Sequence, residues 1–179
     1  MRRLVGLGSL VLLAALTTTA LTPRPLAGPA AIKDMLEGMF RAIDAGDRPA
    51  AKACLADDCP YPVQIFDMDP NNQPVAIEGV DAARKYLDSL FDALAKDHIK
   101  VASKITKIHP DCNSPDLGYA TLEFTQTFKA GDTTATSSYR ATVLVHWGKD
   151  QSKGPKIFHW HSSLAPAPET KGDAKGDKK

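Results

Sequence analysis

The chain has 179 residues, of which 43% are hydrophobic and 24% are charged, and its 22 basic residues nearly balance its 21 acidic ones. This profile is typical of one ordinary globular domain and leaves no room for two packed domains. Without residues 1–27, which we treat below as a signal, 19 basic and 21 acidic residues remain. A basic nucleic-acid-binding groove is therefore not expected.

Residues 1–27 have the pattern of an export signal. The chain opens with Met1-Arg2-Arg3, and residues 4–16 are apolar apart from Gly and Ser. A positive start followed by about 13 apolar residues suits a signal peptide, whereas a membrane-spanning helix needs about 20. We predict cleavage near residue 20 or 27 and export to the periplasm or the medium, with no stable membrane span afterwards. An uncleaved anchor is the alternative.

The other end of the chain, residues 165–179, reads APAPETKGDAKGDKK and contains no aliphatic side chain larger than Ala. Such a segment cannot offset the entropy lost on ordering, so it predicts a disordered polar tail. The folded domain is expected over residues 28–164.

Three cysteines, Cys54, Cys59 and Cys112, would enter an oxidising compartment on export. Because the number is odd, at least one thiol stays free or pairs between chains. Both Cys54–Cys59 and Cys59–Cys112 are possible disulfides, and the sequence does not choose between them. No motif supports a catalytic thiol.

The first half of the domain has helical spacing. Apolar residues recur every three or four positions over residues 32–43, and Gly46 follows where a C-terminal cap would lie. A shorter helical piece runs from residue 47 to about 55. A second long amphipathic helix is predicted over residues 80–94, and a hairpin of residues 61–66 and 75–77 precedes it.

The second half alternates between apolar and polar residues with the period of a β-strand. Four strands are predicted around residues 99–105, 122–128, 139–145 and 156–163. The order of elements is helix, helix, hairpin, helix and a four-strand meander. This order predicts an α+β domain in which helices pack on the concave face of a strongly bent antiparallel sheet and leave a cone-shaped cavity.

This order resembles the nuclear transport factor 2-like superfamily, and in particular its SnoaL-like branch and the association domain of calcium/calmodulin-dependent protein kinase II. The resemblance spans residues 31–166. It rests on four strings: AI and GD within residues 42–47, IEGVD at 77–81, FTQ at 124–126, and FHWHSS at 158–163, which is the most specific.

The resemblance implies association, with a homodimer or a larger homo-oligomer paired through the outer face of the sheet. It does not transfer the family's ligand. The association domain has a basic cup for small carboxylates, but Glu123 and Ser162 stand at two of its arginine positions and Ala83 at its histidine position. The chain has no kinase or calmodulin-binding segment.

Several residues are candidates for the lining of the cone. Arg140 lies mid-strand and could project inward to bind an anionic ligand, or it could simply pair with Glu123 on the neighbouring strand. His159 and His161 share one strand face, with Trp160 on the other. This spacing suits a proton-transfer pair or a subunit contact, and two histidines alone are weak evidence for a metal. Further candidates are Tyr61, Tyr86 and Ser162.

A catalytic alternative follows from the ketosteroid isomerases and polyketide cyclases that share the resembled fold. The string FDMDP resembles the approach to the isomerase base, which makes Asp67 or Asp69 the candidate base. The predicted first helix offers Phe40 where the isomerase has its oxyanion-binding Tyr, so half of that site is missing. An Asp beside Pro is also common in turns.

The sequence leaves three functions open. The first is an exported, non-catalytic module that binds a small, partly apolar ligand in its cone. The second is an isomerase or lyase acting on a carbonyl compound, with Asp67 or Asp69 as base and His159 or His161 assisting. The third is an assembly protein whose cavity has no ligand. No metal, cofactor or nucleic acid is expected in any of them.

Overall fold

The structure is a computed structural model that describes residues 28–68 and 73–165. The predicted signal segment of residues 1–27, Asp69, and residues 166–179 of the predicted tail lie outside the described residues. In the described part of the chain, no helix combines the length and the apolarity needed to cross a bilayer.

Helix α1 spans Pro29–Ala45 and has the predicted amphipathic pattern. Its proline at the first turn suits a helix start, since the missing N–H would have had no partner there. The helix buries Ile32, Leu36 and Phe40 against the sheet. Gly46 ends it with φ of 71°, a left-handed conformation that only glycine adopts without strain, and its N–H is directed at the last carbonyl groups of the helix.

Two further helices complete this side of the fold. Helix α2 (Arg48–Lys52) begins at Asp47, whose side chain accepts a hydrogen bond from the Ala50 N–H at 3.0 Å. Helix α3 (Val80–Lys96) follows Gly79, which has φ of 93°, and buries Ala83 and Phe91. Both long helices confirm the sequence prediction.

Six strands form one sheet in the order β2-β1-β6-β5-β4-β3. The strands are β1 (Gln64–Met68), β2 (Pro74–Glu78), β3 (Lys100–Cys112), β4 (Leu117–Ala130), β5 (Thr133–His146) and β6 (Lys156–Leu164). The predicted hairpin and four-strand meander are both present. The loop before β6 contains the short 3-10 helix η1 (Gln151–Lys153).

One feature of the sheet differs from the prediction of a purely antiparallel arrangement. Strand β1 pairs with β6 in parallel, with Phe66 opposite His161, so the sheet is mixed. The difference arises because the hairpin of β1 and β2 adds to the sheet beside the last strand of the meander. Strand alternation alone does not reveal which edge a hairpin joins.

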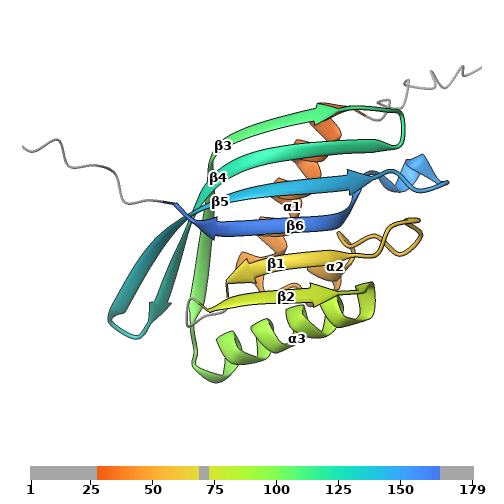
Figure 1. The fold of residues 1–179 in the computed structure, drawn as a ribbon. Helices are drawn as coiled ribbons and strands as arrows, with labels where there is room; N and C mark the ends of the chain where they lie inside the picture. The colour runs from red at the N-terminus through yellow and green to blue at the C-terminus, as the bar shows by residue number, and fades with distance from the viewer. Residues whose placement is uncertain (1–27, 69–72, 166–179) are drawn as a thin grey trace, which may run out of the picture.

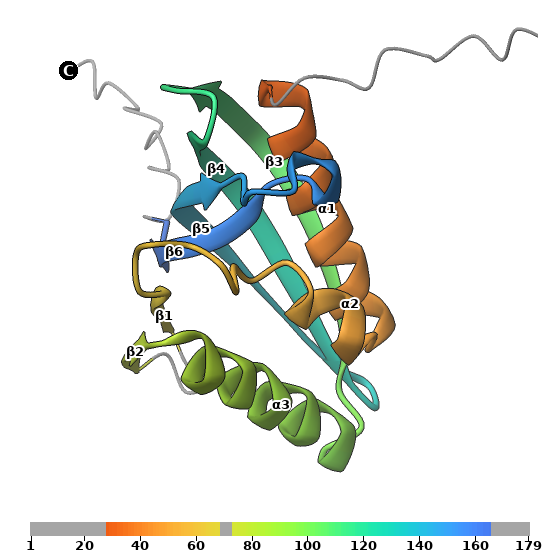
Figure 2. The ribbon, with the colours of Figure 1, turned by 90° about the vertical axis from the view of Figure 1, so that its right-hand side faces the viewer.

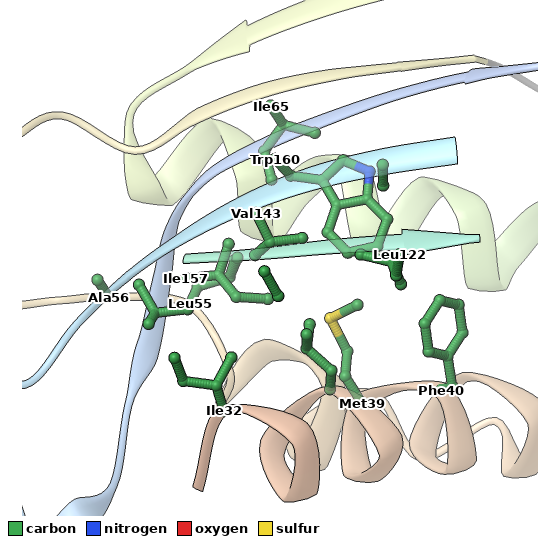
Figure 3. Packing of buried hydrophobic residues seen from close by; sticks show 14 of the residues in the cluster. Ile32, Met39, Phe40, Leu55, Ala56, Ile65, Leu122, Val143, Ile157 and Trp160 are labelled. Carbon is green, nitrogen blue, oxygen red and sulfur yellow. The ribbon is translucent and has the colours of Figure 1, made fainter. Parts of the chain in front are cut away.

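The helices lie on one side of the sheet (Figures 1 and 2). Helix α1 packs on β3 and β4, whereas α3 packs on α2, β1 and β2. The predicted inner faces of β4 and β5 are confirmed, since Leu122, Phe124, Val143 and Val145 are all buried. Figure 3 shows Leu122 and Val143 of these strands facing the side chains of Ile32, Met39 and Phe40 on α1. Burial of each large apolar side chain stabilises the fold by about 1.5–3 kcal/mol.

The three cysteines are all free in the structure, and each is partly buried. Burial raises the pKa of the Cys54 thiol, and the nearby Lys156 ammonium partly opposes that rise. Burial likewise raises the pKa values of Cys59 and Cys112. Neither disulfide considered from the sequence is formed.

Candidate ligand cavity

A cavity of about 380 Å³ lies between the inner face of the sheet and the two long helices. It occurs where the helices diverge, because α1 rests on β3 and β4 while α3 rests on β1, β2 and α2. Leu87, Leu90 and Leu94 on the inner side of α3 are therefore only half-buried, since they border the cavity instead of packing into the core. The opposite wall combines aliphatic side chains with five aromatic ones: Phe40, Phe124, Phe128, Tyr139 and Trp160.

Asp67 is a carboxylate on this otherwise mostly apolar wall. The parallel register of β1 and β6 places it beside Ser162, since Phe66 is opposite His161. The Ser162 hydroxyl donates a short hydrogen bond to Oδ1 of Asp67, and the Tyr86 hydroxyl of α3 donates to Oδ2 at 3.3 Å. These two bonds fix the carboxylate at the wall of the cavity and join three elements that are far apart in the sequence.

Trp160 forms part of the same wall. Its side chain is only 7% exposed, and its ring meets the edges of Phe40 and Phe124 at centroid distances of 6.2 and 6.1 Å. The indole nitrogen has no hydrogen-bond partner among the described residues. In Figure 3 this nitrogen lies on the edge of the ring that points away from Ile157.

Arg140 does not project into the cone, and this part of the sequence prediction is wrong. The inward positions of β5 are odd-numbered, as the burial of Tyr139 and Ala141 shows, so Arg140 lies on the outer face and is 60% exposed. Its Nε lies 3.7 Å from Oε1 of Glu123. The predicted alternative, in which Arg140 pairs with Glu123, is the arrangement observed.

Glu123 lines an outer hollow of about 410 Å³, on the face opposite the cavity. Lys107 Nζ lies 3.0 Å from Oε2 of Glu123. The hydrogen bond from Lys107 is the main cause of a lowered Glu123 pKa, and the positive charges of Lys107 and Arg140 add to it. Exposed pairs of this kind contribute little to stability, because water and salt screen them.

The two histidines of β6 also lie on the outer face, where Phe66 contacts both rings at centroid distances of 5.7 Å to His159 and 6.1 Å to His161. Burial lowers the pKa of His159, and the neighbouring His161 lowers it further. Tyr61 is 50% exposed and stacks on Phe158 at 5.4 Å. None of these five side chains lines the cavity described above.

The structure thus divides the candidates predicted from sequence into two groups. Asp67, Tyr86, Trp160 and Ser162 come together at the inner cavity, whereas Arg140, Glu123, His159 and His161 lie on the outer face. Three polar residues of the cavity were missed: Gln126, Ser137 and Asp97. The sequence did contain a signal for Gln126, which stands between Phe124 and Phe128 in the inward alternation of β4.

No protein-family model matches this chain, and no curated protein matches it either. Several solved structures do match it. The hub of CaMKII from S. rosetta is 18% identical, with 76% of this chain and 96% of that chain covered at a TM-score of 0.57. A ketosteroid isomerase-like protein from Erwinia carotovora atroseptica is 18% identical, with 78% and 97% covered at 0.55. The beta subunit of benzoate 1,2-dioxygenase from Burkholderia mallei is 13% identical, with 76% and 89% covered at 0.58.

These likenesses define the architecture as an α+β cone with helices on one side of a bent, open sheet. The chain has the nuclear transport factor 2-like fold, as predicted from its sequence. At such low identity the comparisons show the fold alone, because proteins with this fold include enzymes, enzyme subunits and association domains.

Proposed function

We propose that the chain is a small-molecule-binding module whose inner cavity holds one small, largely apolar molecule. The observation that carries the proposal is a cavity of about 380 Å³ with apolar and aromatic walls and a fixed polar group, Asp67 held by Ser162 and Tyr86. Ligand sites are typically concave, about 300–1,000 Å³ in volume, and mostly apolar with a few converging polar groups.

A neutral fluorescent probe, 1-N-phenylnaphthylamine, tests this proposal. We expect its emission to rise when it enters the cavity of the purified protein. Ala93 lines the cavity near the end of α3, so Ala93→Phe fills part of the space and should weaken binding at least about tenfold. Ala95 on the same helix is exposed, and Ala95→Phe serves as the matched control. Equal binding by the two variants, or no binding by the wild type, contradicts the proposal.

A second candidate is proton transfer, as in an isomerase or lyase acting on a carbonyl compound. It is favoured by the position of Asp67 in the cavity within hydrogen-bond distance of the Tyr86 hydroxyl. Both Asp67 oxygens already accept hydrogen bonds, which makes the carboxylate better suited to hold a ligand donor than to abstract a proton. We therefore place binding first. Turnover of a β,γ-unsaturated ketone that disappears in Asp67→Asn would reverse this order.

We also propose that the protein self-associates through the outer face of its sheet. Support comes from two of the similar structures, a hub and a dioxygenase subunit, and from Phe66, which is an exposed apolar residue on this face. Light scattering on the purified protein should give a dimer or a larger oligomer. Phe66→Asp should shift it toward the monomer, while Tyr61→Asp, at an exposed aromatic outside the sheet, should not.

Export remains a proposal that rests on the sequence of residues 1–27. Expression of the whole chain in a bacterial host followed by fractionation and intact-mass measurement tests it. We expect a periplasmic or secreted product that begins near residue 21 or 28. A cytoplasmic product with its first residues intact would refute it.

A further inference from the structure

The charges of the inner cavity have one sign. Among the described residues that line it are two carboxylates, Asp67 and Asp97, and no Lys, Arg or His. Two basic residues of the sheet, Arg140 and Lys107, lie on the opposite face beside Glu123. An anionic ligand in this cavity would therefore lose its hydration and meet negative charge, which is costly in a mostly apolar site.

The walls of the cavity also suit a positive charge. Phe40, Phe124, Tyr139 and Trp160 surround one side, with Phe124 and Tyr139 stacked at a centroid distance of 5.1 Å. The faces of aromatic rings are electrically negative and attract ammonium groups, most strongly where water is excluded. The aromatic wall and the carboxylates thus favour the same kind of ligand.

Asp67 is held ready for such a ligand. Ser162 and Tyr86 donate to its two oxygens from β6 and α3, so its orientation is set before a ligand arrives. Each carboxylate oxygen can accept more than one hydrogen bond. A fixed acceptor of this kind binds a charged donor without the entropic cost of ordering its own side chain.

We propose that the natural ligand of the cavity is a small hydrophobic amine, bound as its ammonium ion with an N–H donated to Asp67 and its apolar skeleton against the aromatic wall. This inference rests on the proposed binding function and specifies its ligand class. It replaces the anionic ligand considered from the sequence, because that expectation depended on Arg140 facing the cone.

Three probes with one ring system test the charge preference: 1-naphthylmethylamine, which is cationic at pH 7, the neutral 1-naphthalenemethanol, and the anionic 1-naphthoate. Dissociation constants are measured by calorimetry on the wild-type protein. We expect the amine to bind at least about tenfold more tightly than the alcohol, as a charge-assisted hydrogen bond is stronger than a neutral one. The naphthoate should bind most weakly.

Two variants test whether Asp67 causes the preference for the amine over the alcohol. In Asp67→Asn the affinity for the amine should fall to about that for the alcohol, while the affinity for the alcohol changes less than about threefold. Glu123→Gln removes a carboxylate from the outer face and should leave all three affinities unchanged. Retained binding of the alcohol shows that the Asn variant still has its cavity.

The outcomes separate this inference from the proposed function. If neither phenylnaphthylamine nor any naphthalene probe binds the wild type, cavity binding itself fails. If the alcohol or the naphthoate binds the wild type as tightly as the amine, the ammonium inference is overturned while cavity binding stands. This ranking needs no variant, so misfolding of Asp67→Asn does not prevent the test. A preference for the amine that survives in a folded Asp67→Asn protein also overturns it.

Discussion

Substitution of Gly118 by Ala should destabilise the fold because there is no space for one more carbon atom. Gly118 is a buried residue of β4, beneath the first turns of α1. A Cβ atom there would lie 2.7 Å from Cδ1 of Ile32, 2.9 Å from the Asp111 carbonyl oxygen and 3.0 Å from Cζ3 of Trp147. The end of the Ile32 side chain can move, but the backbone carbonyl of β3 cannot move without breaking its strand pairing.

The size of the effect follows from this crowding. Overpacking of a dense interior costs about 1–3 kcal/mol, and we expect the upper half of that range because one neighbour is backbone. For a chain of this length such a loss lowers Tm by about 4–12 °C. Urea unfolding followed by circular dichroism measures the loss as a lower midpoint with an unchanged slope.

Gly38→Ala provides the matched control. Gly38 lies within α1, and the nearest atom to an added Cβ is an Arg41 nitrogen at 3.8 Å. With open space and helical backbone, Ala should stabilise the protein by about 0.5–1 kcal/mol. Replacement of Gly by Ala should thus destabilise the protein at position 118 and stabilise it at position 38. If Gly118→Ala unfolds at the wild-type urea concentration, the described packing of α1 on β4 is wrong.

Two further predictions concern electrostatics. Lys52 Nζ contacts both carboxylate oxygens of Asp88 at 2.7 and 2.9 Å and so links α2 to α3. Lys52→Met should therefore lower the free energy of unfolding by about 0.5–1 kcal/mol in low salt and by less in 1 M salt. Equal losses at the two salt concentrations would contradict an ionic contribution. Because the folded-state pKa of His159 is lowered, the unfolded chain binds its proton more readily, and stability should fall as the pH drops below the ordinary histidine value of about 6.5. His159→Gln should reduce that fall, as measured by urea midpoints between pH 7.5 and 5.5, and an identical pH profile would refute the assignment.

The helices and the inner strand faces were predictable because their patterns are local. The spacing of apolar residues in α1 and α3 and the alternation in β4 and β5 depend only on which side meets the core. Gly46 and Gly79 marked helix boundaries for the same reason, since positive φ is required there. The pairing of β1 with β6 was not predictable, because it joins residues almost 100 positions apart.

The site was harder to predict because it depends on which face of the sheet each side chain points to. On the last strand, β6, a β-bulge determines which side chains point inward. Ile157 and Trp160 both face inward although they are three residues apart, since Phe158 is an extra residue where the pairing with β5 shifts between Leu144 and Val145. Strict alternation from Ile157 would have turned Trp160 and Ser162 outward. Without the inward Ser162, Asp67 would lose the hydrogen bond that the Ser162 hydroxyl donates to it.

The same bulge explains why the two faces of the sheet carry opposite chemistry. It directs His159 and His161 outward, to the face where Arg140 and Lys107 lie, and leaves the inner face with aromatic rings and Asp67. Deletion of Phe158 would remove the bulge without exchanging these faces, because His159 and Trp160 would then follow Ile157 in ordinary alternation. Trp160 and Ser162 would stay inward, and Ser162 would still lie beside Asp67. A deletion variant that folds should therefore keep its preference for the amine over the alcohol.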